Sequence, residues 1–354
     1  LMIRRPPRST QSRSSAASDV YKRQTSFLTS GLGFMQMAHA AETKNVNIAV
    51  LICCGMESGW DSTFVDSMKR VQAAKPHGLN ITFEYSDPIY GDDVVDAMHL
   101  YAESGEYDII FNHTGMPNVS KVNGDYPDIA FVSSGSGNTG GTDNHYWIYK
   151  RVHEATYVLG VMAGHLTENG KLGVVGTFPA DDVNDEINAF FAGARSVRPD
   201  IKQSVSFIES WYDPGKAAEM TSAQISTGAD IIFSLANNFT ACEDAGIICF
   251  GNFADESPYS PSTILSSAMA VWDPDITRVI DAWWDFKENG KPHSGTPVLK
   301  YATMAQGGTA IAPLNPALLE RVPADVIKIV EQTIKDIMSG DLVVELDVSV
   351  PKSN

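Results

Sequence analysis

The sequence predicts an α/β fold in which two doubly wound lobes each carry a parallel sheet. Strand-like segments alternate with helical segments of about a dozen residues, which is typical of parallel βαβ units. The alternation runs through the chain twice, so two similar halves follow one another. The length of 354 residues also corresponds to two domains of ordinary size.

The first half begins with an apolar run, NIAVLICC at 47–54, which is typical of a strand buried on both faces. The loop GMESGWDST follows it. The next helices are expected at 64–74 and 91–104, with a short helical stub at 119–122. Further strands are expected at 80–85, 107–112 and 128–133.

A glycine-rich loop, SSGSGNTGGTDN, spans residues 133–144. The glycines at 135, 137 and 140 match the GxGxxG spacing of dinucleotide-binding loops. In those proteins the glycines open a helix in the first βαβ unit, whereas here the strand-like HYWIYK follows. We therefore expect a mobile or ligand-facing loop and no dinucleotide site.

The second half begins with a strongly apolar helix at 154–168 and a strand at 171–177. Further helices are expected at 185–197, 275–289 and 323–339, and a segment at 238–245 is short for a crossover helix. Further strands are expected at 229–235, 247–251 and 263–270, followed by a hairpin of 298–304 with 309–312.

One stretch, SVSFIESWYDPGKAAE at 204–219, combines a strand, a turn and a helix start. The turn DPG has a proline that fixes φ and a glycine that tolerates positive φ, and Asp213 is placed to cap the helix. Trp211 and Tyr212 therefore lie at the carboxyl end of a strand, where ligands bind in open α/β sheets. An aromatic side chain there either packs on the core or stacks on a ligand ring.

Composition excludes two classes of partner. The net charge of −17 argues against binding to nucleic acid and to an anionic membrane surface. A hydrophobic content of 43% is that of a soluble globular protein. Neither value identifies a ligand.

The first 40 residues do not fit the rest of the chain. Residues 1–24 carry six Arg or Lys and one Asp. They are either a disordered basic arm or translated adapter sequence, and we exclude them from fold reasoning. Residues 25–40 have the apolar run and the small-x-small ending of a secretory signal peptide, so the mature chain is expected to begin near Ala41.

The four cysteines do not form a framework. Cys53 and Cys54 are adjacent in an apolar strand, so their side chains are expected on opposite faces. Cys242 and Cys249 flank a short helix–strand connection. Buried free thiols are expected, with a Cys242–Cys249 bridge as the alternative in an oxidising compartment.

The sequence predicts no enzyme, no catalytic residue, no metal site and no cofactor. It contains no nucleophile elbow, P-loop, HExxH or paired CxxC motif, and its histidines form no local cluster. A hydrolase of the nucleoside-hydrolase type would need carboxylates that bind Ca²⁺ near the first strand. The candidate acids Asp61, Asp92, Asp93 and Asp96 fall in a loop and on a helix.

Five segments carry a family resemblance: LGVMAG, GKLGVVG, NAFFAGARSVRPDI, SWYDPGKAAE and ADIIF. In this order they resemble the BMP (basic membrane protein, or PnrA-like) family of ABC-transporter substrate-binding proteins, over residues 45 to about 339. The resemblance implies a type I periplasmic binding protein fold, with two lobes joined by three strands and ligand between them. The implied N-terminal lobe is 44–152 with 253–292, the C-terminal lobe is 153–252 with 293–320, and 321–354 is a helix and tail.

The resemblance also implies stacking residues. Trp211 lies where the family has a stacking aromatic before its DP turn. Trp60 and Phe64 lie in the first loop and helix start, where the family places its other stacking ring.

Polar site residues are implied in the same way. Asn112 and His113 lie at the third-strand edge that lines the family's pocket, and Asp255, in GNFADE, lies in the loop that holds a ligand-binding acid. From the residues alone, His113 either donates to a ligand or caps loop carbonyls.

Two departures bear on the ligand. Nucleoside binders of the family have Asn where this chain has Val65, and Lys where this chain is apolar, near Ala270. Because those groups would serve the ribose, the resemblance implies the nucleobase branch. The expected function is capture of a purine nucleobase such as adenine, with a purine nucleoside or another small aromatic ligand as the alternative. The expected setting is the periplasm, where a monomer delivers its ligand to an ABC permease and ATPase.

Overall fold

The computed structural model describes residues 44–298 and 300–354. The expectations for residues 1–24 and 25–40 lie outside the described residues. In the described part of the chain, no helix combines the length and apolar character needed to cross a bilayer.

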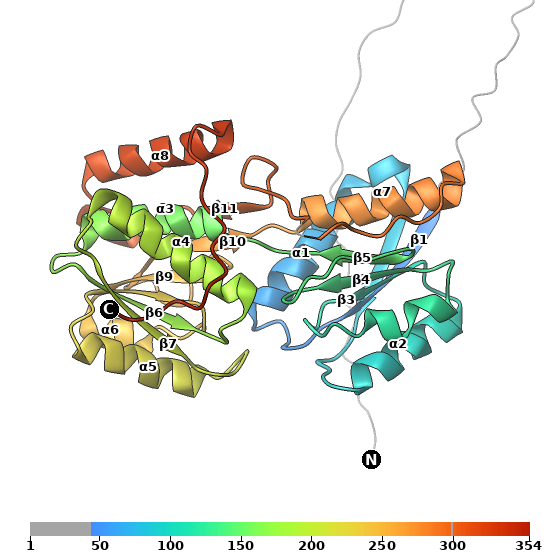
Figure 1. The fold of residues 1–354 in the computed structure, drawn as a ribbon, viewed down its shortest axis with the longest axis horizontal. Helices are drawn as coiled ribbons and strands as arrows, with labels where there is room; N and C mark the ends of the chain where they lie inside the picture. Colours follow the sequence, from blue (N-terminus) through green and yellow to red (C-terminus); the bar gives the residue numbers. More distant parts are fainter. Residues whose placement is uncertain (1–43, 299) are drawn as a thin grey trace, which may run out of the picture. The chain divides into compact units, whose positions relative to one another are not determined.

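The first sheet has five parallel strands in the order β2-β1-β3-β4-β5 (Figure 1). The strands are β1 (Asn45–Leu51), β2 (Asn80–Tyr85), β3 (Ile109–Asn112), β4 (Ala130–Ser134) and β5 (His145–Ile148). The helices that pack against it are α1 (Gly59–Ala74), α2 (Asp93–Ser104) and α7 (Asp273–Asn289). Short 3₁₀ helices lie at η1 (Pro76–Gly78), η2 (Val119–Lys121) and η3 (Asn123–Asp125).

The second sheet has six strands in the order β11-β10-β9-β8-β6-β7, and only β11 runs antiparallel among them. The strands are β6 (Lys171–Gly176), β7 (Lys202–Phe207), β8 (Ile231–Ser234), β9 (Ile248–Phe253), β10 (Ile264–Ala270) and β11 (Thr309–Ile311). The helices of this half are α3 (His153–Leu166), α4 (Asp181–Val197), α5 (Pro214–Ser226), α6 (Thr240–Ala245), the 3₁₀ helix η4 (Pro316–Arg321) and α8 (Ala324–Ser339).

The predicted α/β class with parallel sheets is confirmed. Two of its elements show how the local sequence produces the fold. Strand β1 buries both faces: Ile48 and Val50 join one apolar cluster, whereas Ala49 and Leu51 join another. Helix α5 begins where the DPG turn predicted, because the Asp213 carboxylate accepts the Lys216 N–H (3.0 Å).

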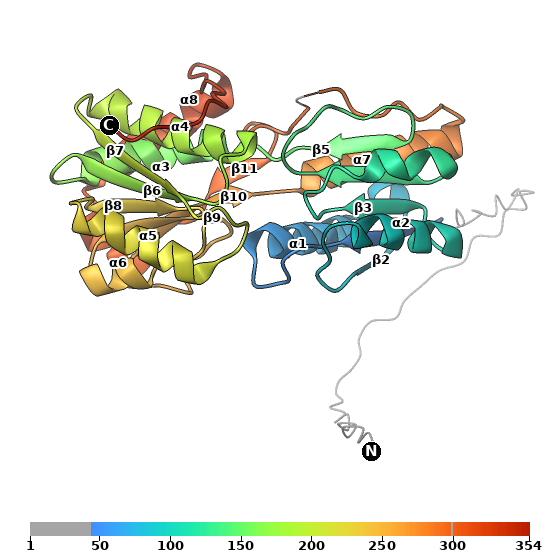
Figure 2. The same cartoon turned by 60° about the horizontal axis from the view of Figure 1, so that its bottom comes forward.

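Helices α3 and α4 lie side by side in both views (Figure 1 and Figure 2). Glycines make this contact possible, because a Cβ on Gly160 would collide with the Phe190 carbonyl oxygen and one on Gly193 with the Tyr157 carbonyl oxygen. The LGVMAG and FFAGAR segments therefore carry glycine to let two backbones approach.

The chain passes between the two sheets at 149–152, at 271–272 and in the described residues 290–298 and 300–308. Lys150, in the first of these crossings, is 3% exposed. Its ammonium group donates to the carbonyl oxygens of Val271 (2.7 Å) and Gly308 (3.1 Å) and to the Asp275 carboxylate (2.8 Å). One buried cation of the first crossing thus binds backbone carbonyls of the other two crossings.

Two strand placements differ from the sequence-based expectations. We expected residues 253–292 in the N-terminal lobe, but β10 pairs with β9 and β11 in the second sheet, and only α7 packs on the first. We also expected 309–312 to form a hairpin with 298–304, but β11 pairs with β10. Periodicity identifies a strand but not its partner, which long-range packing decides.

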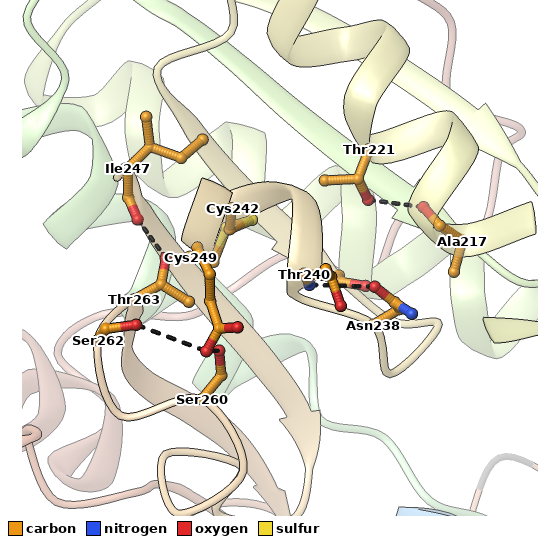
Figure 3. The surroundings of a disulfide bond; sticks show 12 residues. Ala217, Thr221, Asn238, Thr240, Cys242, Ile247, Cys249, Ser260, Ser262 and Thr263 are labelled. Carbon is orange, nitrogen blue, oxygen red and sulfur yellow. Dashed lines mark hydrogen bonds between the residues drawn. A yellow bond between two sulfur atoms is a disulfide. The ribbon is translucent and has the colours of Figure 1, made fainter. Parts of the chain in front are cut away.

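The cysteines also differ from the expectation of free thiols. Cys242 and Cys249 form a disulfide between α6 and β9 (Figure 3). Cys53 and Cys54 are free, and their sulfur atoms lie 2.7 Å apart rather than on opposite faces. Strand β1 ends at Leu51, so the strand alternation assumed for this pair does not apply.

Candidate functional site

A pocket lies where the strands of both sheets end, and segments of both halves line it. From the first half it is lined by Cys53, Cys54, Ser58, Trp60, Thr114 and the loop residues Gly135 and Ser136. From the second half it is lined by Thr177, Asp182, Glu186, Trp211, Asn237, Asn252 and Phe253. The carboxyl edge of parallel sheets is where binding sites form, because strand ends and helix starts meet there.

Trp60, the other expected stacking residue, lies at the start of α1, is half-buried and lines the pocket. Its indole N–H donates to the His113 carbonyl oxygen (2.9 Å), which fixes the ring. Its face lies on the His113 ring, with centroids 4.6 Å apart and planes within 13°. The Ser58 hydroxyl accepts the Trp60 backbone N–H (3.3 Å) and so caps the helix that presents the ring.

His113 and Phe64 lie behind Trp60 and do not line the pocket. Both are fully buried, and the His113 ring stacks on Phe64 at 4.0 Å. His113 Nε2–H donates to the Trp60 carbonyl oxygen (3.2 Å), and Nδ1 accepts from the Ser134 hydroxyl (2.8 Å). Burial lowers the pKa of His113 to about 3, so the ring is neutral and structural.

Asn112 and Asp255 also lie outside the lining. The Asn112 amide donates to the Met116 carbonyl oxygen (2.7 Å) and accepts from the Thr114 hydroxyl (2.6 Å), so it shapes the loop after β3. The Asp255 carboxylate accepts from Ser257 N–H (3.1 Å) and its hydroxyl (2.7 Å), which is a local turn. Contacts within their own loops account for both residues.

Trp211, which we expected to stack on a ligand, lines the pocket from the second half. It is 48% exposed, which is unusual for an indole ring. Its ring lies 5.0 Å from that of Phe178 and is tilted by 59°. Phe178 therefore packs against the ring, and about half of the residue's surface is exposed to solvent.

Two carboxyl groups on α4 form an acidic wall that the sequence analysis missed. Asp182 accepts from the Ser136 hydroxyl (2.6 Å), and the Asn252 amide donates to Glu186 (2.7 Å). Burial raises the pKa of Glu186 well above its usual range, and it also raises that of Asp182. These groups therefore retain protons more readily than exposed carboxyls, and a protonated carboxyl can donate a hydrogen bond.

A second missed group surrounds Glu256. Burial raises the pKa of Glu256 to about 8, and its carboxyl accepts from the Asn252 backbone N–H (2.9 Å) and the Asn237 amide. The Asn252 side-chain oxygen is buried and has no hydrogen-bond partner within residues 44–298 and 300–354. A buried unpaired acceptor that lines a pocket is a natural partner for a ligand N–H.

Backbone strain concentrates at the same edge. Glu209, Asn237 and Phe253 adopt left-handed φ angles of 52°, 52° and 62° at the ends of β7, β8 and β9. Such angles cost about 1–3 kcal/mol for residues other than glycine and cluster at ligand sites. Asn237 and Phe253 both line the pocket.

One signal could have identified the missed residues. Asp182, Asn237 and Asn252 each follow or end a strand of the second half, which is the same positional argument that selected Trp211. Acids in a first helical turn, however, also stabilise the helix dipole, so Asp182 did not stand out. The glycine-rich loop, which we expected to be mobile or ligand-facing, contributes Gly135 and Ser136 to the pocket lining.

Comparison with known proteins decides the family. Residues 46–272 match the family described as Bmp, the PnrA-like ABC transporter substrate-binding proteins. This chain belongs to that family. The family and fold are those of solute-binding proteins, which work with a small-molecule ligand and with the permease and ATPase of an ABC transporter.

Relatives and solved structures agree with this family membership. A purine-binding protein of Brucella abortus is 29% identical over 327 residues, which is 88% of this Bmp-family chain and 86% of that protein. A putative ABC transporter glucose-binding protein of Haloferax volcanii is 30% identical over 224 residues, covering 59% of this chain and 56% of that one. A solute-binding protein structure from Aeropyrum pernix superposes with a TM-score of 0.69 at 17% identity, covering 85% and 94% of the two chains. The fold is that of type I periplasmic binding proteins.

Proposed function

We propose that this Bmp-family protein is the solute-binding component of an ABC importer, that it works in the periplasm after signal-peptide cleavage, and that its ligand is a purine nucleobase such as adenine. One observation carries the ligand assignment: two indole rings, Trp60 and Trp211, line one pocket from the two halves of the chain. The polar side chains that line the same pocket can both donate and accept hydrogen bonds.

A purine base matches this arrangement. Its faces are flat and apolar, so they gain from stacking on aromatic rings, by about 1–3 kcal/mol per base. Its edges alternate N–H donors with ring-nitrogen acceptors. The unpaired Asn252 oxygen suits a donor, and protonated Glu186 or Asp182 suits an acceptor. The Brucella abortus relative, named as purine-binding, supports the same ligand class.

The nucleobase is favoured over the nucleoside by two positions. Val65 is fully buried and Ala270 is 3% exposed, and neither lines the pocket. These small apolar side chains do not reach the pocket, so neither position supplies a donor for a ribose hydroxyl, and a buried hydroxyl without a partner costs about 1–3 kcal/mol. Purine nucleosides are the alternative ligand. A sugar is the second ligand class to test, because the Haloferax volcanii relative is named as a putative glucose-binding protein.

The deciding experiment is a titration of intrinsic tryptophan fluorescence with adenine, guanine, hypoxanthine, adenosine, uracil and glucose. We expect saturable quenching by a purine base and weaker or no response to adenosine, uracil and glucose. Trp211→Ala should weaken base binding by about tenfold or more, because one stacking face is lost.

Trp284→Ala is the matched control. Trp284 lies on α7 and stacks on His77, with ring centroids 4.8 Å apart and outside the pocket. Its loss should leave base affinity unchanged. Saturation by glucose and no response to any base would overturn the purine assignment, and tighter binding of adenosine than adenine would select the nucleoside.

A further inference from the structure

The loop after β1 places two adjacent thiols in the wall of the pocket. Cys53 and Cys54 both line it, and their Sγ atoms lie 2.7 Å apart. Cys53 is buried, whereas Cys54 is partly exposed and its Sγ lies 3.2 Å from the Tyr90 hydroxyl. The proposed function gives these sulfur atoms no role.

The Asp61 carboxylate holds the backbone of this loop. It is fully buried and accepts from the N–H groups of Cys54 (2.7 Å) and Gly55 (2.9 Å). Asp61 lies in the first turn of α1, next to Trp60, rather than in the loop where we expected it. The conformation of the dithiol is therefore connected to the turn that presents the stacking ring.

The spacing of the sulfurs favours a covalent bond over a shared metal ion. Cys53, Cys54 and Asp61 lie close enough together to be considered as metal ligands. Two thiolates bound to one tetrahedral metal at about 2.3 Å would lie about 3.8 Å apart, whereas a disulfide needs about 2.05 Å. The 2.7 Å separation of the sulfurs is nearer to the bonded distance.

We propose that Cys53 and Cys54 are a reversible modification site, which closes to a disulfide between adjacent residues and thereby weakens ligand binding in the pocket. The oxidant is a low-molecular-weight disulfide or a protein disulfide of the extracytoplasmic compartment. The chain already carries one disulfide, between Cys242 and Cys249, which is consistent with folding in an oxidising compartment.

The chemistry balances as thiol–disulfide exchange. The Cys54 thiolate attacks one sulfur of the oxidant RS–SR, which forms a mixed disulfide and releases RS⁻. The Cys53 sulfur then attacks Cys54 Sγ, forms the Cys53–Cys54 bond and releases the second RS⁻. The two thiol protons end on the two RSH products, so two cysteine thiols are oxidised and one disulfide is reduced.

The order of attack follows from the surroundings of the two thiols. Cys54 is the more exposed, and hydrogen bonding from Cys53, with a further contribution from Tyr90, lowers the pKa of Cys54. Hydrogen bonding to Cys54, together with burial, raises the pKa of Cys53. Cys54 is therefore the attacking thiolate and Cys53 the resolving thiol.

Ring closure changes the pocket through the peptide between the two residues. Consecutive Cα atoms lie only about 3.8 Å apart, below the usual span of a disulfide, so the backbone must turn to close the bond. The Cys54 N–H that donates to Asp61 belongs to that peptide unit. We expect about tenfold weaker ligand binding in the oxidised form, equivalent to about 1.4 kcal/mol; this part of the proposal rests on the proposed function.

Peptide mass spectrometry tests bond formation without any ligand. The purified chain is incubated with oxidised glutathione, alkylated with iodoacetamide and digested with trypsin. Cleavage after Lys44 and Lys69 gives a peptide of residues 45–69 that carries both thiols, whereas Cys242 and Cys249 fall together in residues 217–278. We expect the 45–69 peptide without alkyl groups and lighter by two hydrogens, and doubly alkylated if dithiothreitol precedes alkylation.

Two results would overturn the disulfide. One is a doubly alkylated 45–69 peptide after oxidant treatment, and the other is a stable glutathione adduct on one cysteine with the other alkylated. Cys53→Ser is the matched variant, because it retains the attacking thiol and should stop at the Cys54–glutathione adduct. If that variant does not fold, Cys53→Ala offers the same test.

Fluorescence titration of the oxidised and reduced forms then tests the coupling to ligand. Equal affinity of both forms for adenine would overturn the coupling. Failure of both forms to bind any purine would overturn the proposed function and its coupling, while the peptide masses would still decide the disulfide.

Discussion

At the scale of single residues, His113 determines how Trp60 is presented. It lies between Trp60 and Phe64, and it exchanges hydrogen bonds with Trp60 in both directions through backbone carbonyls. A neutral imidazole can donate through one nitrogen while accepting through the other, which an apolar ring cannot do. This residue therefore acts on the ligand only through the tryptophan.

Truncating His113 is expected to reduce both stability and affinity. His113→Ala leaves a cavity between two rings and should lower the free energy of unfolding by about 3 kcal/mol, measured by urea denaturation. Base affinity should fall as well, because Trp60 loses its support. His113→Phe retains the stack and should lose less stability. A His113→Ala variant with wild-type stability would contradict this role.

Glu256 is expected to make stability depend on pH. Burial raises its pKa from 4.5 to about 8. Below pH 4.5 the group is protonated in both states, and between 4.5 and about 8 only the unfolded chain ionises. The stabilisation that the neutral Glu256 carboxyl adds to the free energy of unfolding is therefore complete below pH 4.5. It is lost as pH rises toward 8, by up to about 5 kcal/mol at 1.36 kcal/mol per pH unit.

Glu256→Gln isolates this contribution. Glutamine cannot ionise, so the difference in unfolding free energy between wild type and variant should change between pH 5 and pH 8, in the direction that disfavours the wild type as pH rises. Denaturant melts at several pH values measure it. A difference that is independent of pH would show that Glu256 is not buried in its neutral form.

At the scale of elements, the crossings between the sheets are joined by Lys150. Its ammonium group and the Asp275 carboxylate are both almost fully buried, and Arg278 also contacts Asp275 (3.1 Å). The Trp272 ring lies 4.9 Å from the ammonium nitrogen, which adds a cation–π contact. The three crossings between the sheets, which contain no regular strand in their described residues, are thus linked through the contacts of one buried ammonium group.

Removing this cation is expected to be costly. Lys150→Met leaves two backbone carbonyls and a buried carboxylate with fewer partners, and should destabilise the protein by about 3 kcal/mol. Lys150→Met combined with Asp275→Leu should recover part of that loss, because no unpaired buried carboxylate remains and the Arg278 guanidinium that loses its partner is partly exposed. Thermal denaturation of both variants provides the comparison. A double variant less stable than the single one would contradict the explanation.

At the scale of the whole molecule, the pocket belongs to both halves of the chain. A ligand that contacts both sheets binds the native state and not the unfolded chain, so it stabilises the fold by mass action. Saturation at a hundred times Kd is worth about 2.7 kcal/mol.

Adenine at that concentration should therefore raise Tm by about 4 °C in differential scanning calorimetry. Uracil at the same concentration should produce no shift, and Trp211→Ala should show a smaller one at equal adenine concentration. An equal shift in wild type and Trp211→Ala would mean that the base binds without this ring.

The site was partly predictable because some of its signals are local. Trp211 was found from its place before the DPG turn at the end of a strand, and Trp60 from the family resemblance; both line the pocket. Phe64, Asn112, His113 and Asp255 lie near in sequence to pocket residues but face the core or their own loops. Sequence adjacency cannot distinguish these orientations, because neighbouring side chains at a strand end point in different directions.

The sequence by itself determined the alternation of strands and helices, the α/β class, the cap at Asp213 and the family, because each depends on short-range patterns. Only the tertiary structure decided that β10 pairs in the second sheet, that Cys242 meets Cys249, and that Asp182 and Glu186 join Trp60 in one pocket. The physical reason is distance along the chain. Periodicity reports which face of an element is apolar, whereas the partner of that face is chosen by packing between segments far apart in sequence.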